Sequence, residues 1–153
     1  MDSVEVIADR LISAIEAGDR EALGALYADD VVIWHNTDQV EMTKEQNLAS
    51  LDALTAMTTA RRYSDIRRHL IDGGFVKQHV LNLDWGSGSG ALPGCVVVQL
   101  RDGLISRIDE YLDGATIASF GARPQSSLPQ DAGRIPITSD RSLVRMNSSN
   151  SST

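Results

Sequence analysis

The 153-residue chain lacks several features that would define a class of protein. It has one cysteine, so no disulfide can form within the sequence, and this favours a reducing compartment. No apolar run approaches the ~20 residues that a membrane-spanning helix needs. The acidic, amphipathic start lacks the basic and apolar segments of a secretory signal. We therefore expect a cytoplasmic protein that does not enter a membrane.

Positive charge is also scarce, since the formal net charge is −7 at pH 7. Nucleic-acid-binding proteins usually present a basic face, and the arginines between residues 61 and 68 are diluted by aspartate. The histidines have no short ligand spacing, and no glycine-rich loop leads into a helix that could hold a phosphate. We expect no nucleic-acid partner, no metal and no cofactor.

The first half of the chain reads as helical. Apolar residues at helical spacing predict helices over residues 3–17, 20–27 and 44–59. Gly18 is a typical helix stop, and Asp19 is a typical N-cap for the helix that follows. Thr43 and Gln46 fit a capping box at the start of the third helix.

The second half reads as strands separated by glycine turns. The strand-like runs cover residues 31–36, 61–71, 75–85, 93–100 and 105–113. Asp102 and Gly103 are a two-residue hairpin signal between the last two runs. Helices early and strands late predict an α+β fold, with an antiparallel sheet covered on one face by helices.

The composition changes near Gly121. The segment after it holds three of the four prolines and ends in NSSNSST, without hydrophobic periodicity. Such a segment lacks the apolar residues needed to form a packed core. We therefore expect one folded domain over residues 1–120 and a disordered, Pro/Ser-rich tail over residues 121–153.

Glu110 is the most informative single residue. In a regular strand it shares a face with Leu104, Ile108 and Leu112, and is a carboxylate in a mostly apolar row. A carboxylate in that position must be paired, hydrated in a cavity, or held at a raised pKa. Acid–base enzymes use this kind of environment. A β-bulge would exchange Glu110 with Asp109, because one extra residue reverses every later side chain.

The order of elements and four local patterns resemble the nuclear-transport-factor-two-like superfamily. The patterns are AGDREALGALYADDV, VVIWHN, GGFVKQHVL and VVVQLRDGLISRIDEYLD. This superfamily includes ketosteroid isomerase, limonene epoxide hydrolase and the SnoaL-like polyketide cyclases. The resemblance implies a cone-shaped curved sheet, with the N-terminal helices closing a deep apolar pocket. It also implies a homodimer through the open face of the sheet.

The resemblance to limonene epoxide hydrolase also suggests roles for single residues. Glu110 matches a carboxylate just before a Tyr-x-Asp ending, and Trp34 and Asn36 match two residues that hold the reacting water. Val80 and Asn82 stand near the positions where the relative has an arginine and an aspartate. The absence of that pair counts against epoxide hydrolysis by the same mechanism.

Three further residues complete the candidate site. His79 falls on the face with Phe75, and either packs in the core or shuttles a proton with Glu110. If Trp34 and Asn36 face the pocket, His35 points away from it, and packing is the favoured role. Asp38 follows at the expected pocket mouth, as a base or a turn residue. We predict Glu110 and His79 as catalytic residues, and list the substrate-binding candidates as Trp34, His35, Asn36 and Asp38.

The sequence thus predicts a small cofactor-independent acid–base enzyme. It would be an isomerase, cyclase, dehydratase or hydrolase acting on a compact apolar molecule such as a polyketide, steroid or terpenoid. Two alternatives share the fold, namely a non-catalytic ligand binder and a dimeric interaction module. Two titratable groups within hydrogen-bond reach favour the enzyme, whereas a Glu110–arginine pair favours the binder.

Overall fold

A computed structural model describes residues 1–121, and most of the predicted tail lies outside them. The described range contains four helices: α1 (Val4–Ala17), α2 (Arg20–Leu26), α3 (Lys44–Met57) and α4 (Gly114–Gly121). The same range contains six strands: β1 (Tyr27–His35), β2 (Glu41–Met42), β3 (Ala60–Ile71), β4 (Gly74–Asp84), β5 (Ser89–Arg101) and β6 (Leu104–Leu112). None of these helices is long and apolar enough to span a membrane.

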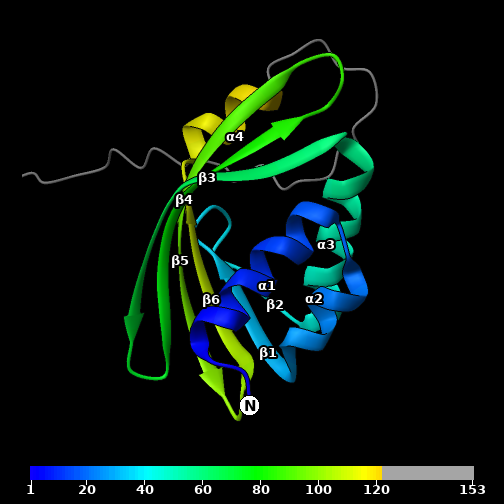
Figure 1. The fold of residues 1–153 in the computed structure, drawn as a ribbon. Helices are drawn as coiled ribbons and strands as arrows, with labels where there is room; N and C mark the ends of the chain where they lie inside the picture. The colour runs from blue at the N-terminus through cyan, green and yellow to red at the C-terminus, as the bar shows by residue number, and fades with distance from the viewer. Residues whose placement is uncertain (122–153) are drawn as a thin grey trace, which may run out of the picture.

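The six strands form one curved sheet in the order β2-β1-β6-β5-β4-β3, and α1, α2 and α3 lie on one side of it (Figure 1). This is the predicted α+β arrangement, but the sheet is mixed rather than fully antiparallel. Strand β1 pairs with β2 in antiparallel and with β6 in parallel orientation. The parallel pair forms because the β3–β6 meander ends with β6 running in the same direction as β1.

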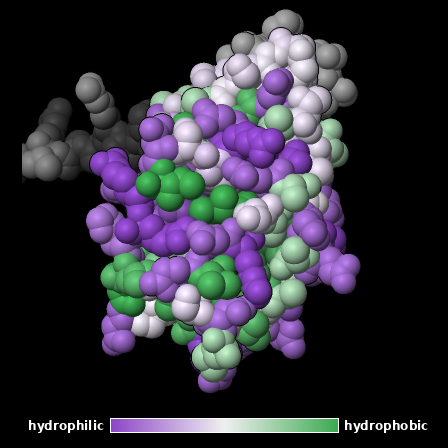
Figure 2. Space-filling model, in the orientation of Figure 1, coloured by the Kyte–Doolittle hydropathy of each residue, from purple (hydrophilic) through white to green (hydrophobic). Residues whose placement is uncertain are grey.

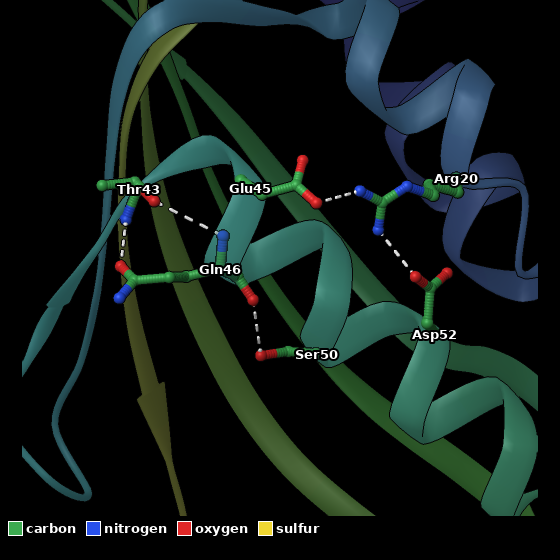
Figure 3. Close-up of polar contacts among 6 residues, drawn as sticks. All are labelled: Arg20, Thr43, Glu45, Gln46, Ser50 and Asp52. Atoms are coloured by element: carbon green, nitrogen blue, oxygen red, sulfur yellow. Dashed lines mark hydrogen bonds and ion pairs between the residues drawn. The ribbon is translucent and has the colours of Figure 1, made fainter.

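The predicted helix ends are confirmed. Gly18 ends α1 with a left-handed φ of 67°, and the Asp19 side chain accepts a hydrogen bond from the Ala22 backbone amide. At the start of α3 the Thr43 hydroxyl accepts from the Gln46 amide, and the Gln46 side chain accepts from the Thr43 amide (Figure 3). These bonds satisfy amides that the first helical turn leaves unpaired.

Helices α2 and α3 are joined by a charged contact. Arg20 binds Glu45 and also Asp52, the latter at 2.6 Å between Nη1 and Oδ2 (Figure 3). All three side chains are exposed. Exposed ion pairs of this kind contribute roughly 0–1 kcal/mol each, so the contact orients the helices more than it stabilises them.

Strand β6 contains a bulge that the sequence did not reveal. Leu104 is exposed and Ile105 is fully buried, so the prediction that Leu104 shares a face with Ile108 is wrong. The pairing of β6 with β5 shifts by one residue between Gln99 and Leu100. Beyond the bulge the alternation is regular, and Glu110 pairs with buried Val96.

The main hydrophobic core lies between the helices and the sheet. It joins residues of α1, α2 and α3 to strand residues that include Ile33, Phe75, Val96 and Ile108. We call the helix-covered side of the sheet its inner face and the opposite side its outer face. On the face of the molecule seen in Figure 2, hydrophilic residues (purple) are interspersed with small clusters of hydrophobic residues (green).

Candidate active site

A histidine–carboxylate pair lies on the inner face, formed by His35 and Glu110. The two residues are partners in the parallel pairing of β1 and β6, and His35 Nε2 lies 2.9 Å from Glu110 Oε2. Their side chains are 17% and 23% exposed, so the pair is sheltered but not fully buried. No arginine is within ion-pairing distance of Glu110 among residues 1–121.

The partner of Glu110 is therefore His35, for which the sequence favoured a packing role. Strand β1 alternates as predicted, but the set that faces inward is Val31, Ile33 and His35. The prediction that Trp34 and Asn36 face the interior is wrong. The two faces of β1 carry similar numbers of apolar residues, so alternation alone could not choose between them.

Trp34 and Asn36 have structural contacts instead. The Trp34 ring packs against Tyr111 on the outer face, with centroids 5.4 Å apart in an edge-to-face arrangement. The Asn36 amide donates to the Leu112 carbonyl at 3.1 Å and accepts from the Leu112 amide at 2.8 Å. These contacts extend the β1–β6 pairing and fix the orientation of the Asn36 side chain.

Asp38 lies in the loop after β1, where its carboxylate accepts a hydrogen bond from the Val40 amide at 3.0 Å. That is the turn role that the sequence also allowed.

The hydrogen bond to Glu110 raises the pKa of His35, and the charges of Glu110 and Asp38 add to this effect, while burial opposes it.

His79 lies on the inner face of β4, as the alternation predicts. Its ring is 4.8 Å from that of Tyr63 in an edge-to-face contact, and Gly94 on β5 leaves room for its Nε2. Its buried Nδ1 has no well-formed hydrogen bond, only a weaker interaction with the Lys77 backbone. Burial, reinforced by the Lys77 charge, lowers the pKa of His79 to about 4.

Lys77 is an inner-face residue that the sequence analysis missed. It is 1% exposed, and its Nζ lies 3.9 Å from the centroid of the Tyr63 ring. Burial lowers the pKa of Lys77 to about 8. The alternation that placed Phe75 and His79 inside also places Lys77 there, which is the signal that could have found it.

The Glu110 charge reaches the other polar groups of this face. It adds to the effect of burial in raising the pKa of Tyr27 and Tyr63. It opposes the effect of burial on Lys77 and His79. The Tyr27 hydroxyl also donates to Asn47 on α3 at 2.9 Å. The inner face thus gathers one carboxylate with groups that hold or exchange protons.

The two inner-face histidines should give opposite pH dependence of stability. In the unfolded chain His79 takes up a proton below about pH 6.5, its ordinary pKa, whereas in the folded chain it does so only below about pH 4. The free energy of unfolding should therefore fall as the pH falls from 6.5 to 4. The free energy of unfolding should change by at most ~1.4 kcal/mol per pH unit, before solvent screening is counted. For His35 the raised pKa gives stability that is complete below pH 6.5 and is lost as pH rises through the folded value.

Urea denaturation between pH 4.5 and 8 measures both effects. In a plot of unfolding free energy against pH, His79→Gln should reduce the slope on the acid side, and His35→Gln should reduce the slope on the alkaline side. His69→Gln is the matched control, because His69 is exposed on β3. An unchanged acid slope in His79→Gln would contradict the assigned role of burial.

Four grooves on the described residues have volumes of about 330 to 490 Å³. None of these four is lined by Glu110 or His35, so the deep apolar pocket implied by the resemblance is not among them. One of these grooves, with a volume of about 380 Å³, is lined in part by His79, Gly94 and Leu112.

Several solved structures have folds similar to that of this chain, among them proteins from three different organisms. A candidate polyketide cyclase from Pseudomonas putida is 18% identical with a TM-score of 0.69, over 78% of this chain and 98% of that one. A hypothetical protein from Catenulispora acidiphila with a ketosteroid isomerase-like fold, in complex with trimethylamine, is 17% identical with a TM-score of 0.67, over 76% and 92%. An epoxide hydrolase from Mycobacterium tuberculosis, resembling limonene epoxide hydrolase, is 17% identical with a TM-score of 0.60, over 74% and 85%.

At this level of identity the solved structures show the fold alone, and they confirm the predicted cone-shaped α+β class. A comparison with curated proteins gave no match. A family model described as a SnoaL-like domain matches residues 8–108, which span α1 through most of β6. The chain belongs to the SnoaL-like domain family.

Proposed function

We propose that this protein is a cofactor-independent acid–base enzyme in which Glu110 and His35 move protons on a compact apolar molecule. The observation that carries the proposal is the 2.9 Å contact between His35 Nε2 and Glu110 Oε2 on a sheltered inner face. Two titratable groups within hydrogen-bond reach are what an acid–base mechanism requires. A non-catalytic binder has no need for such a pair.

The roles follow from the chemistry of the pair. The Glu110 carboxylate accepts a proton from a carbon or from water. Its contact holds the His35 imidazole in one orientation and favours the protonated form, which donates a proton to a substrate oxygen. Such proton transfer contributes about 10²–10⁴-fold to a rate. Isomerisation, aldol-type cyclisation, dehydration and hydrolysis all use this exchange.

The fold neighbours include a candidate polyketide cyclase and an epoxide hydrolase, and both reaction types agree with the proposal. Asn82 donates to Ser64 Oγ at 2.9 Å, in a contact between β4 and β3. It therefore serves strand pairing, near the position where limonene epoxide hydrolase has an aspartate. This supports cyclase, isomerase or dehydratase chemistry over epoxide opening by that mechanism.

The test is turnover of a panel of compact apolar ketones, β-hydroxy ketones and epoxides, followed by mass detection of products. We expect at least one compound to react, in a way that depends on both Glu110 and His35. Compounds that stabilise the protein against heat without ever reacting would contradict the enzyme and support the binder.

We also propose that two copies associate through the outer face. A row across neighbouring strands of this face contains Trp34, Val97 and Val76, and Tyr111 beside it is 49% exposed. Charged Asp109 lies in the same row, between Trp34 and Val97, and a half-buried row of this mixed character suits a wet interface. Light scattering after size exclusion should give a dimer for the wild type and a monomer for Tyr111→Arg. Met57→Arg, on the helix side and 51% exposed, is the matched control, and a monomeric wild type at micromolar concentration would contradict the proposal.

A further inference from the structure

The chain has only two lysines, and Lys44, with its side chain 26% exposed, is the more accessible of the two. Lys44 lies at the start of α3, where its Nζ binds the Asp29 carboxylate at 3.1 Å. Lys77 is 1% exposed, in the middle of the inner face of β4. Lysine is almost never fully buried unless it is paired, so the position of Lys77 needs a reason.

No hydrogen bond or ion pair joins Lys77 Nζ to another side chain within residues 1–121. Its Nζ lies over the Tyr63 ring, 3.9 Å from the centroid. Lys77 pairs with Val96 across β4 and β5, and Val96 pairs with Glu110 across β5 and β6. The amine and the carboxylate therefore belong to one row of the inner face, with a single strand between them.

Burial raises the share of the Lys77 amine that is neutral at pH 7. With a pKa of about 8, roughly a tenth of the amine is neutral at pH 7, which is on the order of 300-fold more than for an ordinary lysine. Only the neutral amine has the electron pair that attacks a carbonyl carbon. Buried lysines with lowered pKa values are suited to Schiff-base chemistry.

We propose that Lys77 forms an imine with an aldehyde or ketone substrate on the inner face, in the same row as the His35–Glu110 pair. This inference rests on the proposed acid–base function and names its substrate class, a compact apolar carbonyl compound. The structure supports it through a cluster of groups rather than one residue: a buried amine, an aromatic wall from Tyr63, and a proton-exchanging pair in the same row.

The step balances without any other reactant. The Nζ electron pair forms a bond to the carbonyl carbon, the oxygen takes up a proton, and the nitrogen loses one. The hydroxyl of the resulting carbinolamine takes a proton from the protonated His35 and leaves as water. The nitrogen electron pair forms the C=N bond as the C–O bond breaks, and the nitrogen keeps its remaining proton. The protonated imine makes the adjacent C–H more acidic, and the Glu110 carboxylate is the nearby base that removes that proton.

The experiment traps the imine by reduction. The full chain is incubated at pH 7 with propanal or cyclohexanone and sodium cyanoborohydride, and the labelled peptides are mapped by mass spectrometry. We expect Lys77 to be alkylated about tenfold or more faster than Lys44, because burial lowers the pKa of Lys77 and so raises the neutral share of its amine. Lys77→Met should lose this label while Lys44→Met keeps it. Labelling confined to Lys44 and the terminal amine of wild-type protein would overturn the proposal.

Two further measurements separate this inference from the acid–base function. Glu110-dependent turnover with no label on Lys77, and with full activity in Lys77→Met, would overturn the imine and leave the acid–base function intact. If Lys77 is labelled and the Glu110→Gln variant turns over substrate as fast as the wild type, the imine is supported and the acid–base function is overturned. Circular dichroism of Lys77→Met checks folding, and the wild-type labelling pattern tests the imine without that variant.

Discussion

Replacing Glu110 with glutamine should lower kcat/KM by about 10²–10⁴-fold and leave the fold in place. The amide has the shape of the carboxylate, and its oxygen still accepts a hydrogen bond from His35 Nε2, 2.9 Å away in the native pair. It does not accept a proton at neutral pH, so the base is lost while the packing remains. Steady-state kinetics on a compound found in the turnover panel give the ratio, and circular dichroism checks the fold.

The matched control is Glu41→Gln, which makes the same chemical change on β2. Glu41 is 60% exposed and binds Arg107 at 3.1 Å, away from the His35–Glu110 pair. We expect its turnover to equal that of the wild type. The Glu110→Gln, His35→Gln double variant should lose little more than the worse single variant, because the pair acts as a unit. Equal rates for Glu110→Gln and wild type would remove Glu110 from the mechanism.

The parts of the fold that follow from local chemistry were predictable from the sequence. Gly18 is needed where the backbone is left-handed, and the side chains of Asp19, Thr43 and Gln46 bind backbone amides within three residues. Asp102 and Gly103, with φ of 54° and 77°, form the turn expected between β5 and β6. Each signal depends only on residues that are neighbours in the chain.

The candidate site was only half predictable, because it depends on pairing between distant segments. Alternation placed Glu110 correctly, since the bulge of β6 lies before it rather than beside it. His35 reaches Glu110 only because β1 pairs in parallel with β6, which nothing in the sequence near His35 specifies. Lys77 was missed because a lysine in an apolar row is normally assumed to reach solvent.

The largest loss of stability that we predict comes from Phe75→Ala. Phe75 is 0% exposed on the inner face of β4 and belongs to the main core. Removing a buried phenylalanine ring costs about 3–5 kcal/mol, through lost burial and the cavity that remains. That is a large share of the 5–15 kcal/mol by which domains of this kind are stable. The midpoint of urea denaturation should fall accordingly, with little change in slope.

Leu70→Ala provides the control from the same pairing. Leu70 is the partner of Phe75 across β3 and β4, yet it is 53% exposed. We expect it to change stability by no more than about 0.5 kcal/mol. The contrast tests the position of the core directly, because both substitutions shorten an apolar side chain at one level of the same sheet. Similar losses in the two variants would mean that the helices do not cover β4 where the structure places them.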